Sequence, residues 1–206
     1  SSSAASDVYK RQVDGVPDNP NPAQVLNLSL GGSGACGAAY QAAVNEIIAR
    51  GVLVVAAAGN TVGGAVNEPA SCSGVLGVVA LRHVGSKVGF SDMGPEIGIA
   101  APGGNCINVL PGTPCLYPIL AASNSGTTGP VASVWTDSYD ITVGTSFSSP
   151  MVAAVAGLMV AQRPVMTPSE LTAAIKATAR AFPTTGADNG ANDPTPVPMC
   201  TNIAAA

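Results

Sequence analysis

Residues Val52 to Asn60 read VLVVAAAGN, an unbroken apolar run that ends at Gly59 and Asn60. An apolar run without alternation is typical of a parallel strand that is covered on both faces, and a glycine marks the end of such a strand. Residues 75–81 have the same character. Both stretches therefore predict buried strands of a parallel sheet.

The segments before this run predict a strand and a helix. Residues 25–29 (VLNLS) are a short apolar run bounded by Gly31 and Gly32, which fits a buried strand. In residues 35–50, small and apolar side chains recur at helical spacing, and Gly51 follows as a stop signal. A strand, a helix and a parallel strand in succession imply a right-handed crossover, so the sequence predicts an α/β fold.

The segments after it continue the pattern. A shorter apolar run covers residues 97–101, and the Gly-rich and Pro-rich stretch from there to Thr136 predicts loops with room for a hairpin. We expect a helix over residues 148–162, stopped by Pro164. A second helix opens at residues 167–170 (TPSE), where Thr is the cap, Pro the first helical residue and Glu completes a capping box.

The two ends of the sequence lack these signals. Residues 1–12 carry no apolar period and join abruptly to the segment that starts at Val13, so we expect a non-native leader there. Residues 186–206 have turn chemistry without periodicity and predict an irregular tail. The folded part is therefore expected to be one domain over residues 13–185.

The amino-acid composition indicates which partners and which cellular compartment suit the chain. The net charge is −4 and the few Lys and Arg residues are scattered, so the chain has no basic stripe for nucleic acid. The longest apolar stretch, residues 151–161, is about half the roughly 20 residues that a membrane span needs, so we expect a buried helix and no membrane partner. Five cysteines in a chain of 206 residues suit a secreted protein, because disulfides form in oxidising compartments.

A small hydroxyl residue, Ser146, lies between the Gly144-Thr145 turn and the most apolar predicted helix. At a helix N-terminus, free backbone N–H groups surround such a side chain and can bind developing negative charge, which suits a nucleophile. Ser is also a common helix cap, however, so this position alone does not establish a reactive role.

Four segments decide between these two roles. The chain contains the segments VLNLSLGG, VLVVAAAGN, AAPGG and GTSFSSP. In their order and spacing these segments resemble those of the subtilisin-like serine peptidases of the secreted bacterial type. The resemblance covers residues 13–183. It implies a three-layer sandwich with a mainly parallel sheet flanked by helices. It also implies that Ser146 is the nucleophile and that Asn60 donates its amide to the oxyanion together with the backbone N–H of Ser146.

The same resemblance implies how substrate binds. Ser29-Leu30-Gly31 looks like the edge to which an extended peptide adds by main-chain hydrogen bonds, and Ala57-Ala58-Gly59 like the opposite wall of the first specificity pocket. We therefore expect polypeptide substrates and a monomeric protein.

The chain departs from the family in its catalytic triad. The family's His and Asp precede the LNLSLGG segment, whereas the single histidine, His83, follows it, and Asp14 and Asp18 lack the expected context. We expect this chain to be the C-terminal part of a catalytic domain, incomplete at the N-terminus and inactive alone. The alternative is a non-catalytic fragment or a peptide-binding pseudoprotease. No cofactor or metal site is expected here, although calcium is possible in the full-length parent.

For the cysteines, the resemblance implies a bridge between Cys36 and Cys72. Cys106 and Cys115 lie in one loop, close enough in sequence to form a small ring, and Cys200 is left over. The alternative is five free, buried thiols in a cytosolic protein.

Overall fold

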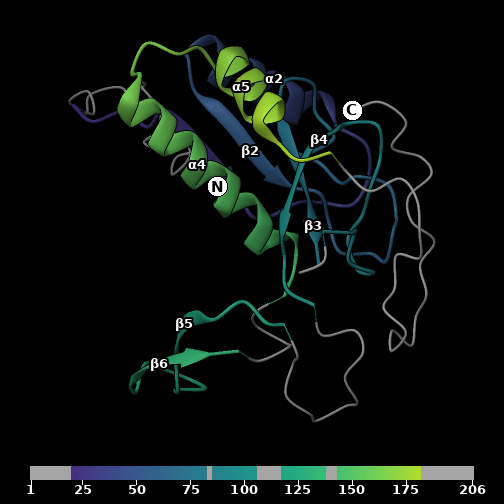
Figure 1. Cartoon of the computed structure of the whole chain (residues 1–206), viewed down its shortest axis with the longest axis vertical. Coiled ribbons are helices and arrows are strands. Elements are labelled where there is room, and N and C mark those ends of the chain that lie inside the picture. The colour runs from purple at the N-terminus through teal and green to yellow at the C-terminus, as the bar shows by residue number, and fades with distance from the viewer. Residues whose placement is uncertain (1–19, 83–84, 106–116, 138–142, 182–206) are drawn as a thin grey trace.

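The structure is a computed structural model that describes residues 20–82, 85–105, 117–137 and 143–181 (Figure 1). Element labels follow Figure 1. The elements of the main body are β1 (Val25–Leu28), α2 (Ala38–Ala49), β2 (Leu53–Ala57), β3 (Leu76–Leu81), β4 (Ile97–Pro102), α4 (Thr145–Gln162) and α5 (Pro168–Thr178). A separate pair consists of β5 (Ala121–Asn124) and β6 (Ser133–Thr136).

The main sheet has four strands in the order β1-β2-β3-β4, and all neighbouring pairs are parallel. Leu53 lies opposite Val25, and Leu76 lies opposite Val55. The two inner strands are buried almost throughout, whereas the outer strands β1 and β4 are largely half-buried. The predicted α/β fold is therefore confirmed, with strands in the predicted places.

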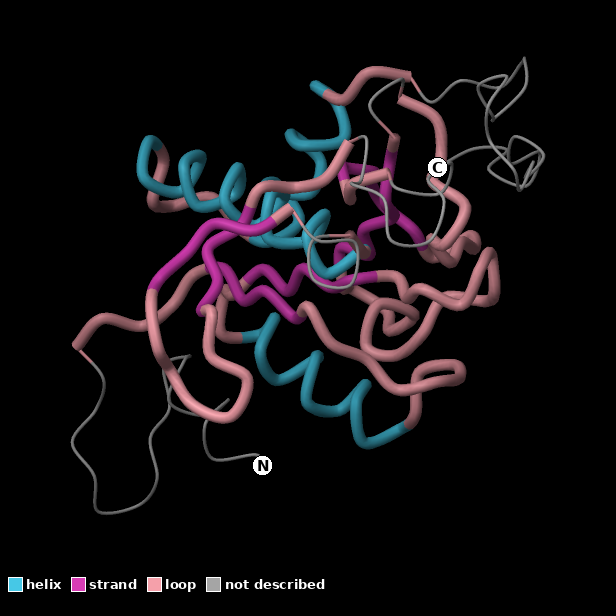
Figure 2. Tube along the Cα trace, turned by 90° about the horizontal axis from the view of Figure 1, so that it is seen from below, coloured by secondary structure: helices cyan, strands magenta, loops and turns pink. Residues whose placement is uncertain are grey.

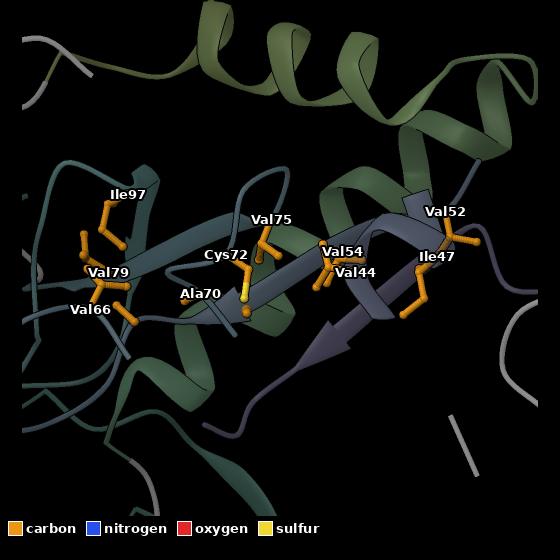
Figure 3. Close-up of a cluster of buried hydrophobic side chains, with 12 residues drawn as sticks. Val44, Ile47, Val52, Val54, Val66, Ala70, Cys72, Val75, Val79 and Ile97 are labelled. Carbon is orange, nitrogen blue, oxygen red and sulfur yellow. The ribbon is translucent and has the colours of Figure 1, made fainter. Parts of the chain in front are cut away.

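Successive residues of β2 serve opposite faces of the sheet, which explains why the run is apolar without interruption. Val54 and Ala56 pack in a cluster with Val44 and Ile47 of α2 (Figure 3). Leu53 and Val55 pack in a second cluster, which includes side chains of α4 and α5. Figure 2 shows the resulting layers, with α2 on one side of the sheet and the other two helices on the opposite side. The expected three-layer sandwich is confirmed.

Cys36 and Cys72 form a disulfide with their Cα atoms 4.9 Å apart, as the family resemblance implied. The bridge joins the segment before α2 to the loop before β3, and Cys72 is 3% exposed within the cluster of Figure 3. Because it closes a ring across 36 positions of sequence, the loop-entropy model gives it about 3 to 4 kcal/mol of stabilisation. Cys106, Cys115 and Cys200 lie outside the described residues.

The hairpin expected within residues 102–136 is present as the antiparallel pair β5 and β6, which stands apart from the main sheet (Figure 1). The helix expected to begin at Ser148 begins at Thr145 instead, so Ser146 lies within its first turn. The start at Thr145 is fixed by hydrogen bonds with Asn60 and Ser29, which are distant in sequence.

Helix α4 packs against all four strands of the main sheet. Its length and apolar composition alone would allow it to cross a membrane. Its contacts with four strands are those of a helix that covers one face of a sheet, but only 33% of its residues are buried, so the expectation of a buried helix holds for its sheet-facing side alone. Helix α5 carries the predicted capping box, since Thr167 and Glu170 each accept a hydrogen bond from the backbone N–H of the other.

Candidate active site

The candidate residues come together at one edge of the sheet. Ser29 follows the end of β1, and Asn60 follows the end of β2. Because β1 and β2 are parallel, their carboxyl ends meet at the same edge. The first turn of α4 lies at that edge, where it is hydrogen-bonded to both residues. The structure therefore brings together Ser29, Asn60 and Ser146.

Ser146 and Ser29 exchange hydrogen bonds. Ser146 is partly buried, and its Oγ donates to the backbone oxygen of Ser29 over 3.3 Å. In return, Ser29 Oγ donates to the backbone oxygen of Ser146 over 2.8 Å. Within an ordinary helix that oxygen would accept from the N–H of residue 150, but residue 150 is proline and has none. The side chain of Ser29 thus supplies the donor that Pro150 removes.

Asn60 is oriented by Thr145. The backbone N–H of Thr145 donates to Asn60 Oδ1 over 2.9 Å, and Thr145 Oγ1 lies 3.0 Å from the same oxygen. Thr145 Oγ1 also accepts from the backbone N–H of Gly59 over 3.2 Å. With its oxygen held in this way, the exposed Asn60 side chain leaves Nδ2 without a hydrogen-bond partner among the described residues.

Two free donors converge beside Ser146. Its backbone N–H belongs to the first turn of α4 and has no hydrogen-bond partner in the described part of the chain. A Cβ built on Gly144 would lie 3.6 Å from Asn60 Nδ2 and 3.7 Å from Ser146 N, so both donors border the same space beside Gly144. Gly144 has φ +145°, a conformation that favours glycine. The arrangement can bind a small anionic oxygen next to the Ser146 hydroxyl.

The AAPGG segment holds the same helix start. The backbone N–H of Gly144 donates to the backbone oxygen of Gly103 over 2.8 Å, and Ser148 Oγ donates to that of Pro102 over 3.2 Å. A side chain on Gly103 would collide with Ala80 and with Ser148. All four segments that carry the family resemblance therefore meet around the first turn of α4.

The residues expected to bind substrate follow β1 and end β2 at the same edge of the sheet. Leu30 is 58% exposed, and Gly31 and Gly32 pass so close to Glu68 that a Cβ on Gly31 would overlap its backbone oxygen. Ala57 and Ala58 are buried at the end of β2, whereas Gly59 is partly exposed. Their pocket-lining role stays a prediction.

His83, Asp14 and Asp18, which the sequence analysis does not assign to the triad, lie outside the described residues. Within the described ranges, no three His, Cys, Asp or Glu side chains gather where they could hold a metal ion. Calcium in a longer protein stays a prediction. An open cavity of about 640 Å³ lies between the sheet and helices α4 and α5, and none of the candidate site residues lines it.

Two residues of the site were missed by the sequence reasoning. Thr145, which orients Asn60, stands within the GTSFSSP segment, so its place before the candidate nucleophile was a usable signal. The other is Asp92, whose fully buried carboxylate accepts hydrogen bonds from the loop after Asn60. Nothing in the local sequence around Asp92 indicates that contact.

Comparison with known proteins adds three findings. The model of the subtilase family matches residues 2–195. That match runs across the boundaries expected at residues 12 and 185, which stay predictions. Over 173 residues the chain is 40% identical to an extracellular protease of Xanthomonas campestris pv. campestris, and over 164 residues it is 40% identical to an extracellular basic protease of Dichelobacter nodosus.

These matches cover most of this chain but a minor part of the relatives. They include 83% and 77% of the chain and 27% and 24% of the two relatives. Among solved structures, a protease from Pseudoalteromonas arctica superposes with a TM-score of 0.76 and 36% sequence identity. That superposition covers 88% of this chain and 52% of the other, so the chain spans about half of the similar structure.

Proposed function

Because this chain belongs to the subtilase family, we propose that it forms part of a secreted serine endopeptidase that cleaves protein substrates through an acyl-enzyme on Ser146. The observation that carries the proposal is the convergence of two free donors, Asn60 Nδ2 and the backbone N–H of Ser146, beside the Ser146 hydroxyl. Relatives named as extracellular proteases and a disulfide suited to an oxidising compartment support secretion.

The proposed chemistry has two halves. In the first, Ser146 Oγ attacks the carbonyl carbon of the substrate, and its proton passes to a general base. The carbonyl oxygen becomes an oxyanion, which accepts hydrogen bonds from Asn60 Nδ2 and from the backbone N–H of Ser146. The C–N bond then breaks, the amine leaves with the proton, and Ser146 carries the acyl group. In the second half, water releases the acid and restores the hydroxyl.

Asn60 suits this role because Thr145 fixes its amide. An oxyanion donor is effective when it is oriented before the reaction, since no reorganisation is then needed as charge develops. The two bonds from Thr145 to Asn60 Oδ1 leave Nδ2 as the outward-facing end. Substrate would lie along Ser29-Leu30-Gly31, where the exposed Leu30 offers an apolar contact.

The general base and its orienting carboxylate are proposed to come from a part of the protein outside this chain. The only histidine is His83, and the family's His and Asp precede the segment around Ser29. This chain by itself should therefore show no peptidase turnover above background. The monomeric state and calcium binding of the whole protein are further expectations.

The test is an assay of three proteins on an unfolded protein substrate: the full-length gene product that carries this sequence, its Ser146→Ala variant, and residues 1–206 alone. We expect turnover only from the first. Turnover by the Ser146→Ala variant would overturn the proposal. Saturable peptide binding by a full-length product without turnover would instead favour the alternative, a peptide-binding pseudoprotease.

A further inference from the structure

The segment after β3 carries a carboxylate, Asp92, which is fully buried. Its Oδ1 accepts from the backbone N–H of Thr61 over 2.8 Å, from Thr61 Oγ1 over 2.8 Å and from the backbone N–H of Gly64 over 3.0 Å. Its Oδ2 accepts from Asn67 Nδ2 over 3.2 Å. All four donors belong to residues 59–67, the segment called here the Asn60 loop.

The contacts of Asp92 enclose Asn60 on both sides in sequence. The backbone N–H of Asp92 donates to the backbone oxygen of Gly59 over 3.0 Å. Its carboxylate receives the N–H of Thr61 on the other side of Asn60. Asp92 therefore holds the chain on both sides of Asn60, while Thr145 holds the end of the Asn60 side chain.

The Asn60 loop has few apolar contacts that could hold it instead. Thr61, Gly63 and Ala65 are exposed, and Val62 is 73% exposed with φ +64°. Burial resumes only at Val66, which is 3% exposed. Two further backbone bonds, from Val62 N–H to Phe90 and from Met93 N–H to Gly64, also tie the loop to the segment that carries Asp92. The loop is thus held largely by polar contacts with that segment.

The glycines of the loop make room for this carboxylate. A Cβ on Gly59 would collide with Asp92 Oδ2 and with Asn67 Nδ2, and one on Gly64 would come within 3.3 Å of Asp92 Oδ1. Gly59 also has φ +118°, which disfavours a side chain. Burying a carboxylate costs free energy unless hydrogen bonds satisfy it. The four hydrogen bonds that satisfy the Asp92 carboxylate all come from the Asn60 loop.

We infer that Asp92 is a positioning residue for catalysis, which acts by holding the Asn60 loop so that Asn60 Nδ2 points to the oxyanion. This inference rests on the proposed function. Asp92 does not touch the reacting atoms, so it differs from the catalytic residues Ser146 and Asn60. The expected signature is a lower kcat with little change in KM, because the oxyanion contact forms only in the transition state.

The experiment compares kcat and KM for Asp92→Ala, Asp92→Asn, Asn60→Leu and the double variant Asp92→Ala/Asn60→Leu in the full-length protease. Asp92→Ala should lower kcat roughly ten- to a hundredfold, the effect of a small misplacement of a catalytic group, and leave KM within about twofold. Asp92→Asn should keep kcat within about threefold, because its remaining oxygen can still accept from Thr61 and Gly64. The double variant should match Asn60→Leu alone.

Leu171→Ala serves as the control for a general loss of stability. Leu171 is 1% exposed on α5 and packs in the cluster on the opposite face of the sheet from α2. It should lower the melting temperature while leaving kcat unchanged below that temperature. If Asp92→Ala does not fold, Thr61→Val removes one donor from an exposed residue and should lower kcat about two- to fivefold in the same direction.

Three results would overturn the inference: an unchanged kcat in Asp92→Ala, an unchanged kcat in Thr61→Val where Asp92→Ala does not fold, or a double variant in which the two losses multiply. Multiplied losses would mean that Asp92 acts independently of Asn60. Failure of the proposed function is recognised separately, because Ser146→Ala would then keep its activity.

Discussion

The two helices on one face of the sheet begin in opposite ways. Helix α5 satisfies its own N-terminus, since Thr167 and Glu170 form a capping box from residues three positions apart. Helix α4 begins at Gly144 without a side-chain cap, and its first turn is held by Asn60 and Ser29, at sequence separations of 85 and 117. The backbone N–H of Ser146 is left free there, within the part of the chain that the structure describes.

The difference separates a helix start that is capped by its own residues from one that is held by distant residues, as the proposed chemistry requires. A capping box uses up the donors of the first turn and so adds stability. A start held from outside can keep a donor available for an anionic group. Substitutions at the start of α4 should therefore act mainly on turnover, and substitutions at the start of α5 mainly on stability.

The largest effect on kcat should come from a substitution in the first turn of α4, at Ser146. In the full-length protease, Ser146→Ala should reduce kcat by about a million-fold, a magnitude taken from subtilisin, a member of the same family. The folded state should persist, because the Ser146 hydroxyl makes a single 3.3 Å hydrogen bond among the described residues. Steady-state kinetics measures kcat, and a thermal melt shows whether the variant is folded. A kcat within a hundredfold of the parent would contradict the account.

The second-largest effect on kcat should come from Asn60, whose Nδ2 is the side-chain donor of the site. Asn60→Leu should lower kcat by roughly a hundred- to a thousandfold with little change in KM, a range that also comes from subtilisin. The reason is that, in the proposed mechanism, Asn60 Nδ2 bonds to the oxyanion of the transition state and not to the carbonyl of the bound substrate. Steady-state kinetics distinguishes the two parameters, and a raised KM with normal kcat would remove Asn60 from the oxyanion site.

A smaller loss is expected from the residue that orients Asn60. Thr145→Val keeps the backbone N–H that donates to Asn60 but removes Oγ1, which lies 3.0 Å from the same amide oxygen. One hydrogen bond is worth about 1 kcal/mol, so kcat should fall roughly two- to tenfold. The same variant combined with Asn60→Leu should show no further loss, and an additional loss would mean that Thr145 acts elsewhere.

The matching substitution on α5 should leave turnover unchanged. Thr167→Ala removes the cap that receives the Glu170 N–H, which should lower the free energy of unfolding by about 1 kcal/mol. Urea denaturation would show a lower midpoint at an unchanged slope. A fall in kcat would show that the two helix starts are coupled.

The smallest effect is a pH dependence at the same cap. The backbone N–H and the hydroxyl of Thr167 both donate to Glu170 and lower the pKa of its carboxyl from the ordinary value of 4.5. A lowered pKa in the folded state adds stability that is complete above the ordinary pKa of the unfolded chain and is lost as the pH falls through the folded pKa. The melting temperatures of the parent and Glu170→Gln should therefore differ slightly at neutral pH and converge as the pH falls from 4.5 through the lowered pKa of the folded state. A constant difference would contradict this.

The contrast between the helices also explains what the sequence could predict. The strand at residues 52–58 and the capping box at Thr167 depend on neighbouring residues, and both were found at the predicted places. The start of α4 was predicted three residues late, because it is fixed by contacts with Asn60 and Ser29. The hydrogen bonds of the Asp92 carboxylate with the Asn60 loop span 25 to 31 positions and carry no local pattern.

The central claim is that Ser146 is the nucleophile, and covalent labelling tests it most directly. A fluorophosphonate reacts with an activated serine when the serine oxygen displaces fluoride from phosphorus. After the full-length protease is treated with this reagent and digested, mass spectrometry should find the adduct on Ser146, in step with loss of activity. The Ser146→Ala variant should carry no adduct. An active protease that is labelled at another residue, or inhibited without any adduct on Ser146, would contradict the account.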